Sequence, residues 1–481
     1  MIDGLVSGYP QAGRPLRRSR LTVGGNITGA SLWGRPFAWI GYCFVFFIVY
    51  LPVSHNEFRG YFIGLVLTII LLRIIANKGK IQLHEITLRW ILFYYLAGTF
   101  FVVLGYVRHA PGALFCALVF VLWPIVYAFL IEAVAPSARM VNILRVLVFG
   151  MIGIGVGTAY FLSWRLGWIS DSLYIDPQLV DNIAFFGNTV QMSHLSLSSL
   201  VFLIPFTISS LYVYSARTPK FLPQWILWLA LSLGFFTAFV GGRRGVFLVL
   251  FTTPFLTLYF HSWLPDRLRP SRFRQVFLTV PLALALLGTG LYLGRATDWT
   301  WEGTWDLFTT GFEFKSDPSA NIRLTQFVAL MQGWKANPLL GAGLGAGVPQ
   351  VVRNSDRPWE YELQYVLLLY QIGVIGILVY GAGLAWIYRE AKKLVMSGSP
   401  LGVHIVPVLV GMTSFLIANA TNPYLQTFGH LWTLFIPVAL INSSLMFERS
   451  REARLRKPLA STESYRGLTP RDSLSIDACR S

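Results

Sequence analysis

The chain has 481 residues, of which 54% are hydrophobic and only 13% are charged. Soluble domains carry about 25% charged residues, so this composition excludes an ordinary soluble enzyme. Apolar runs of about 20 residues recur along the chain and predict an all-α integral membrane protein rather than a barrel. The net charge of +17 is spread over short loops and both tails. This spread is typical of positive-inside topology and does not indicate a nucleic-acid partner.

Twelve membrane spans are predicted in chain order. Their ranges are 37–54, 60–76, 87–107, 111–133, 141–161, 194–215, 222–240, 245–263, 275–293, 362–388, 404–420 and 425–447. The domain organisation follows from them: an N-terminal tail over 1–36, spans 1–9 over 37–293, a large loop over 294–361, spans 10–12 over 362–447, and a disordered basic tail over 448–481. The first span follows basic residues without a small-residue cleavage site, so it is predicted to stay uncleaved.

Basic residues assign a side to each loop. With the N-terminus inside, the inner loops and the tail hold most of them: Lys78, Lys80, Arg139, Arg217, Lys220, Arg267, Arg269, Arg272, Arg274, Arg389, Lys392, Lys393, Arg449, Arg451, Arg454, Arg456 and Lys457. Both termini are therefore predicted to be cytoplasmic. Two long segments, 162–193 and 294–361, fall outside, and loops of such length are usually functional or disordered. The second is predicted to contain a helix from Arg323 to Trp334 that ends before Asn337-Pro338.

The segment FVGGRRGVF, residues 239–247, departs from the charge rule, because it places Arg243 and Arg244 outside. The outer arginines as a set are Arg243, Arg244, Arg295, Arg323, Arg353 and Arg357. A guanidinium binds phosphate through a planar fork of donors and keeps its charge. Flanking glycines allow a tight turn at 241–245. A lipid-linked phosphate is the favoured ligand for the pair, whereas interfacial anchoring is favoured for Arg353 and Arg357.

The glycine-rich stretch NPLLGAGLGAG, residues 337–347, loosely fits a dinucleotide-binding fingerprint. No strand–helix–strand pattern surrounds it, so a nucleotide site is not expected. Two interpretations stay open for Gly341, Gly343 and Gly345: a structural turn, or a backbone cradle for a polar ligand.

Span ten opens on two acidic residues, Glu360 and Glu362. On a helix, Glu362, Tyr365 and Leu369 share one face. Stabilisation of the helix start is one explanation for the acids, and a general base beside a cleft is the other. At the end of span eleven, Asn419 and Asn422 precede the helix breaker Pro423.

The sequence predicts neither a metal site nor a cofactor. Its seven histidines are scattered without metal-ligand spacing, and His430 is expected to be a packed or hydrogen-bonded residue. The three cysteines, Cys43, Cys116 and Cys479, form no disulfide or zinc pattern, and no P-loop is present.

Three pieces together resemble the O-antigen ligase and polymerase superfamily: RLTQFVALMQGWKANPLLGAGLGAG at 323–347, LLLYQIGVIGILVY at 367–380, and GGRRG at 241–245. The resemblance covers about residues 235–440. It implies a GT-C-like bundle with a large, partly helical periplasmic loop in a bacterial inner membrane. It further implies a metal-independent, inverting glycosyltransferase that takes its sugar from an undecaprenyl-pyrophosphate-linked donor. A chain-length regulator would be a further partner, besides the membrane lipids.

Carried over by position, the resemblance places Arg243 or Arg244 together with Arg323 at the donor pyrophosphate. Ligases of this family typically carry a histidine where span ten begins, and this chain has Glu362 there. A carboxylate could also accept the proton of the acceptor hydroxyl. The catalytic residues expected are Glu362, Arg243, Arg244 and Arg323. Arg295, Gly341, Gly343, Gly345, Glu360, Tyr365 and Asn422 are expected to bind substrate.

A polymerase of oligosaccharide repeats of O-antigen or exopolysaccharide is the function we expect, since the missing histidine disfavours a ligase. The alternatives are a ligase that moves finished glycan onto lipid A-core, and a flippase or other transporter. A transporter should place ionisable groups near the bilayer midplane, whereas the polar residues here concentrate in outer loops.

Overall fold

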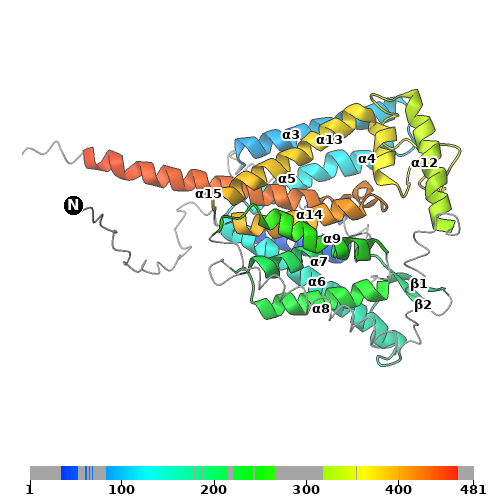
Figure 1. The fold of residues 1–481 in the computed structure, drawn as a ribbon, viewed down its shortest axis with the longest axis horizontal. Helices are drawn as coiled ribbons and strands as arrows, with labels where there is room; N and C mark the ends of the chain where they lie inside the picture. Colours follow the sequence, from blue (N-terminus) through cyan, green and yellow to red (C-terminus); the bar gives the residue numbers. More distant parts are fainter. Residues whose placement is uncertain are drawn as a thin grey trace, which may run out of the picture.

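The computed structural model arranges the chain as a bundle of apolar helices (Figure 1). It describes residues 34–52, single positions between 60 and 68, and then 83–176, 180–186, 189–214, 220–241, 244–266, 318–353, 355–399 and 401–463. The helices in chain order are α1 Gly34–Tyr50, α3 Glu85–Val107, α4 Ala113–Ala117, the π-helix η1 Leu118–Leu122, α5 Trp123–Ala133, α6 Ser137–Arg165, α7 Leu197–Val213, α8 Gln224–Gly241, α9 Arg244–His261, α12 Pro318–Ala336, α13 Gln364–Met396, α14 Gly402–Ala418, the 3-10 turns η3 Tyr424–Gln426 and η4 Phe428–His430, and α15 Trp432–Glu463.

Six helices of the described part are long and apolar enough to cross a membrane. They are Glu85–Val107, Ala113–Ala133, Ser137–Arg165, Gln224–Gly241, Gln364–Met396 and Phe428–Glu452. Four shorter apolar helices, Ala38–Tyr50, Leu197–Val213, Gly245–His261 and Gly402–Ala418, coincide with further predicted spans. These helices support a helical membrane protein. Predicted span 60–76 lies largely outside the described residues and span 275–293 wholly outside them, so the total of twelve stays a prediction.

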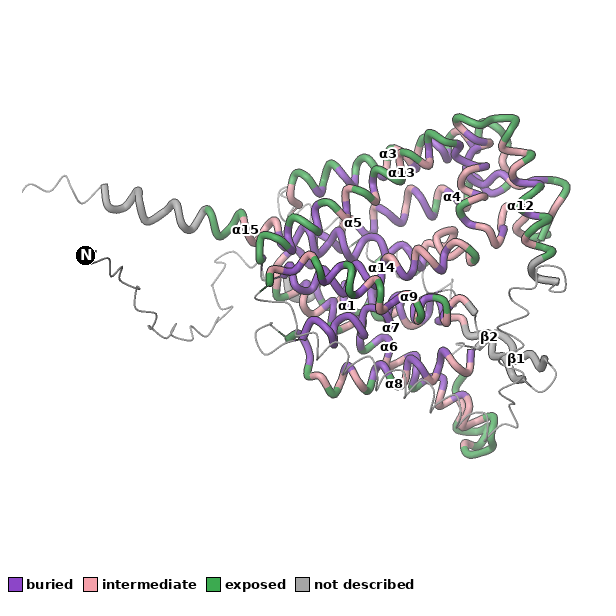
Figure 2. Tube along the Cα trace, viewed as in Figure 1, coloured by how far each residue is buried: buried purple, intermediate pink, exposed green. Residues whose placement is uncertain are grey.

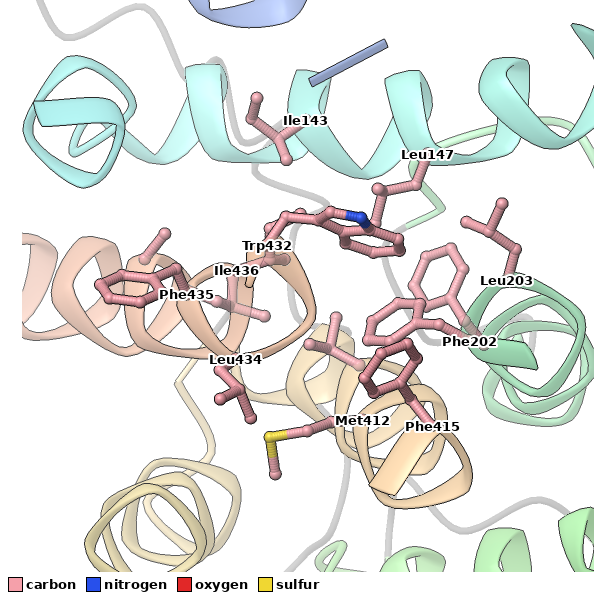
Figure 3. Packing of buried hydrophobic residues seen from close by; sticks show 14 of the residues in the cluster. Ile143, Leu147, Phe202, Leu203, Met412, Phe415, Trp432, Leu434, Phe435 and Ile436 are labelled. Atoms are coloured by element: carbon pink, nitrogen blue, oxygen red, sulfur yellow. The ribbon is translucent and has the colours of Figure 1, made fainter. Parts of the chain in front are cut away.

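The core of the bundle surrounds α7 and α14, which pack against each other. Every residue of α7 is buried, and α14 is buried over most of its length (Figure 2). Side chains from α6, α7, α14 and α15 interdigitate in one cluster (Figure 3). In it the Trp432 ring meets the Phe202 ring edge-on, with ring centroids 4.7 Å apart. Because lipid tails are as apolar as these side chains, close packing is what holds such helices together.

The fourth predicted span is one rod with an irregular middle, in which η1 joins α4 to α5. Pro124 lies at the start of α5 and has no N–H with which to bond the carbonyl of Phe120. The passing helix α3 comes close to this carbonyl at Gly98, where an added Cβ would lie 2.5 Å from the Phe120 oxygen. The wider π turn therefore occurs where a proline removes a helical hydrogen bond and a neighbouring helix passes close by.

A β-hairpin interrupts the otherwise helical architecture. Strands β1 Val180–Phe186 and β2 Thr189–His194 pair antiparallel, with a register irregularity between Val180 and Asn182. The all-α prediction is therefore right for the bundle and incomplete for the long segment 162–193. The sequence held a signal for the hairpin, because Gly-Asn at 187–188 is a dipeptide typical of hairpin turns.

The two ends of the bundle differ. The hairpin and α12 lie at one end, while the last part of α15 projects from the other (Figure 1). Segments 162–193 and 294–361, predicted to share one side, thus have their described parts at one end of the bundle. α15 is helical to Glu463, so the disorder predicted from residue 448 is wrong as far as this residue. Which membrane face each end meets stays a prediction.

Candidate functional site

Helix α12 confirms the predicted helix from Arg323 to Trp334 and is longer at both ends. It packs along the start of α13, where Gly333 leaves room for the Tyr370 ring: an added Cβ would lie 2.8 Å from that ring. The helix ends at Ala336, ahead of Asn337-Pro338 as predicted, because proline disfavours helical geometry in the preceding residue. The Trp334 indole N–H then donates to the carbonyl of Pro338 across 3.1 Å and fixes the turn.

Glu362 lies between two guanidinium groups, an arrangement we call the guanidinium clamp (Arg323, Arg353 and Glu362). Arg323 Nε is 2.7 Å from Glu362 Oε2, and Arg353 Nη2 is 3.0 Å from Glu362 Oε1. The backbone N–H of Glu362 donates to Gln326 Oε1 of α12 across 3.0 Å. Glu362 is thus tied to α12 twice, while both guanidinium groups stay partly exposed.

This geometry changes the interpretation of Glu362. The residue lies two positions before α13, so it is not part of the helix's first turn. A general base must face the substrate hydroxyl. Here Glu362 Oε2 accepts a hydrogen bond from Arg323 Nε, and Glu362 Oε1 forms an ion pair with Arg353. The carboxylate instead fixes Arg323 and Arg353 side by side, with donors left over for an anion. The geometry therefore favours positioning over proton transfer.

The second acidic residue, Glu360, is also engaged. Its Oε1 lies 2.9 Å from Arg357 Nη1, and the Arg357 guanidinium lies over the Phe115 ring, 5.6 Å from its centroid. Arg357 is therefore a packed cation, and Glu360 neutralises it. Arg353 was expected to anchor the chain at the membrane interface. It instead forms an ion pair with Glu362 and belongs to the guanidinium clamp.

The glycine-rich loop 337–348 is a packing element. Gly341, Gly343 and Gly345 all have positive φ, at 70°, 97° and 84°. A Cβ on Gly343 would lie 2.3 Å from the Gly105 Cα of α3, and one on Gly345 would lie 2.2 Å from the Gly112 carbonyl carbon. Only glycine combines this backbone conformation with so close an approach.

The loop's hydrogen bonds explain a kink in α13. Gly373 has φ 63° and ψ −172°, which breaks the helical ladder. The freed N–H groups of Val374 and Ile375 donate to the loop carbonyls of Pro338 and Leu339, each across 3.0 Å. In return, the loop amides of Ala342 and Gly343 donate to the carbonyls of Tyr370 and Gln371.

Further bonds of the loop amides favour one of its two interpretations. The Leu344 amide donates to the Phe101 carbonyl of α3, and the Gly341 amide donates to the Asn337 carbonyl. A phosphate cradle would need such amides to point at the ligand. The geometry favours the structural turn, and it does not support Gly341, Gly343 and Gly345 as substrate-binding residues.

Tyrosine and glutamine side chains hold the loop in place. The Tyr361 hydroxyl accepts from the Val348 N–H across 2.7 Å and donates to the Val348 carbonyl across 3.2 Å. Burial raises the pKa of Tyr361, and the bond from the Val348 N–H partly offsets the increase. Tyr361 therefore stays a protonated donor. Gln371 Nε2 donates to the carbonyl of Ala346 across 2.9 Å.

A chain of contacts joins the guanidinium clamp to the predicted arginine turn. Tyr365, the second residue of α13, donates to the carbonyl of Leu416 near the end of α14. Asn419 follows, and its Oδ1 accepts from the Leu425 amide across 3.0 Å. Asn422 then lies against the start of α9, because a Cβ on Gly245 would be 3.3 Å from Asn422 Nδ2.

The structure thus brings Arg323, Glu362, Tyr365, Asn422 and the start of α9 to one end of the bundle. Helix α9 begins at Arg244. Arg243 and Arg295 lie outside the described residues, as does the side chain of Arg244, so their roles stay predictions. Gln326 was missed by the sequence reasoning, because nothing in the pattern of α12 marks which buried amide meets Glu362.

His430 has the packing role predicted for it. Its Nε2 lies 2.6 Å from Ser198 Oγ of α7, and its Nδ1 pairs with the hydroxyl of Thr427. The ring is buried and packs beside Tyr424. Within the described part of the chain, no group of three or more His, Cys, Asp or Glu side chains could hold a metal ion.

Comparisons with known proteins add no relative. No protein-family model matches the chain, and neither a curated protein nor a solved structure matches it. The family resemblance therefore rests on the sequence motifs and their order along the chain.

Proposed function

We propose that the protein is a glycosyltransferase of the bacterial inner membrane that polymerises undecaprenyl-pyrophosphate-linked oligosaccharide repeats on the periplasmic face. The reaction would be inverting and would need no metal. The acceptor hydroxyl attacks the anomeric carbon of the donor sugar, the bond from that carbon to the pyrophosphate oxygen breaks, and the hydroxyl proton passes to solvent water.

The guanidinium clamp carries this proposal. Arg323 and Arg353 are held together by Glu362 at the end of an apolar bundle, beside the helix that resembles the family's Arg-led helix. Two fixed, partly exposed guanidinium groups suit a pyrophosphate at the membrane surface. Charge neutralisation there would stabilise the leaving group, which gains negative charge as the glycosidic bond breaks.

The nearby segments support the same assignment. Asn422 and the first turn of α9 lie at this end of the bundle, so a lipid phosphate bound by the clamp would also be within the region of the GGRRG turn. In this proposal Arg243 or Arg244 adds a further cation, and Tyr365 and Asn422 contact the sugar.

Purified full-length protein supplied with the lipid-linked repeat in EDTA tests the proposal. We expect a ladder of polymer lengths, which Arg323→Ala should reduce by at least about tenfold, since a charge-assisted hydrogen bond contributes about 1.5–3 kcal/mol. The control is Arg89→Ala, because Arg89 forms an exposed pair with Glu85 on α3. Loss of the ladder in EDTA and its return with added metal would contradict the metal-free reaction.

The glycan profile of a deletion strain separates the alternatives. Single repeats at the cell surface are expected for loss of a polymerase. Long chains that stay on the lipid carrier would indicate a ligase instead. Repeats trapped on the inner face would indicate a flippase.

A further inference from the structure

A small cavity lies beside the guanidinium clamp, where the start of α13 faces α4, η1 and η3. Its lining residues are Phe115, Cys116, Phe120, Trp359, Gln364, Leu368, Gln371 and Gln426. The space between these side chains accommodates about one water-sized group. One lining residue, Trp359, is only partly buried.

Three of the residues that line this space carry polar atoms without partners. Trp359 Nε1, both side-chain polar atoms of Gln364 and both of Gln426 are buried and have no hydrogen-bond partner among the described residues. Gln364 is only 1% exposed. A buried polar group left without a partner costs about 1–3 kcal/mol, so native proteins rarely gather several at one place without a use for them.

The chemistry of the lining residues defines the ligand. The described residues around the cavity carry no charge, and they offer both amide donors and amide acceptors. Arg357 and Glu360 neutralise each other, and the Arg357 guanidinium lies over the Phe115 ring. A group that both donates and accepts, is uncharged and is the size of a water molecule is a hydroxyl.

The cavity also has a fixed relation to the clamp. Gln364 follows Glu362 by two residues, and its backbone N–H donates to the Glu362 carbonyl across 3.1 Å. A third amide, Gln371, is anchored to the glycine-rich loop through Ala346. The clamp and the cavity are therefore adjacent parts of one rigid framework.

We propose that this cavity binds one hydroxyl group of an uncharged sugar unit, with Gln364, Gln426 and the Trp359 N–H as its hydrogen-bond partners. The inference rests on the proposed function for the choice of a glycan as ligand. Ordered water has the same chemistry and is the competing occupant.

Binding of neutral methyl glycosides to the detergent-purified full chain tests the proposal without any turnover. The probes are the methyl glycosides of common hexoses and N-acetylhexosamines, with methyl glucuronide as a charged comparison. We expect at least one neutral glycoside to bind. Gln364→Leu, Gln426→Leu and Trp359→Phe should each raise its Kd by about tenfold, the effect of losing one or two hydrogen bonds. The matched control is Gln332→Leu, because Gln332 is an exposed glutamine of α12.

Thermal unfolding of the same variants separates binding from folding. Replacing an unpartnered buried amide by an apolar side chain should leave Tm unchanged or raise it, so a lost affinity would not reflect a damaged fold. Equal Kd values in all variants, or failure of every neutral glycoside to bind, would overturn the proposal and leave water as the occupant. A Kd that responds to the glutamines while Arg323→Ala has no effect on polymer formation would support the sugar site and contradict the clamp's proposed role.

Discussion

At the residue scale, the guanidinium clamp shows how a contact can change the meaning of a motif. The sequence predicted Arg323 and Glu362 as catalytic residues in separate segments, 39 positions apart. It did not show that they bind each other, nor that Arg353 joins them. Spacing along the chain carries no information on which side chains meet when a loop folds back on a helix.

Substituting Glu362→Gln distinguishes positioning from base catalysis. The amide keeps the shape but presents an NH2 group to a guanidinium, so one arginine loses its fixed place. We expect KM for the lipid-linked donor to rise about tenfold, the effect of about 1.4 kcal/mol, while kcat changes less. Initial rates at varied donor concentration measure both. A general base contributes about 10²–10⁴-fold, so a kcat loss of that size with unchanged KM would restore the base role.

The conservative change Arg323→Lys should also be harmful. Lysine keeps the charge, but it has no planar fork that can hold Glu362 through one nitrogen and offer others to a phosphate. We expect donor affinity to fall about tenfold in a binding assay with the lipid-linked repeat, an effect of about 1.4 kcal/mol. Arg89→Lys, in an exposed pair on α3, should leave the affinity unchanged. Equal behaviour of the two variants would mean that charge alone suffices at position 323.

At the scale of elements, hydropathy predicted the helices well and the contacts between them poorly. Ten predicted spans coincide with described apolar helices, because the hydropathy and length of an apolar run suffice to recognise such a helix. The glycine-rich loop was recognised too, but its two interpretations could be separated only by knowing where its amides donate. The π turn before Pro124 and the kink at Gly373 depend on close approach to other elements, which a local pattern does not encode.

The packing role of the loop predicts that Gly343→Ala destabilises the fold. The substitution forces alanine into φ 97° and places its Cβ 2.3 Å from the Gly105 backbone. The backbone strain costs about 1–3 kcal/mol and the overpacking costs about as much again. We expect a lower Tm and lower yield in detergent. Gly381→Ala is the matched control, because nothing lies within 4 Å of an added Cβ in the middle of α13.

A ligand cradle would give a different pattern at this loop. If Gly343 served substrate binding alone, its alanine variant would unfold at the temperature of the unmodified protein and lose only donor affinity. An unchanged Tm for Gly343→Ala would thus contradict the packing role, whichever result the activity assay gave.

At the scale of the whole molecule, the bundle separates two kinds of surface. α12, the glycine-rich loop and the start of α9 share one end, whereas the last part of α15 lies at the other (Figure 1). The end of α13 lies beside α15, since the Ser397 hydroxyl donates to the Glu448 carboxylate across 3.4 Å. Arg389, close to that end of α13, is largely exposed.

Cysteine labelling tests whether these two ends face opposite sides of the membrane. Starting from a variant with Cys43, Cys116 and Cys479 replaced by serine, single cysteines are placed by Arg244→Cys, Gln332→Cys and Arg389→Cys. We expect an impermeant maleimide to label positions 244 and 332 in intact spheroplasts and position 389 only after permeabilisation, because the charge rule puts the basic end of α13 inside. Labelling of all three from the same side would contradict the arrangement. Labelling of position 389 alone from outside would mean that the bundle is inverted, and the guanidinium clamp would then face the cytoplasm, where the proposed periplasmic reaction could not take place.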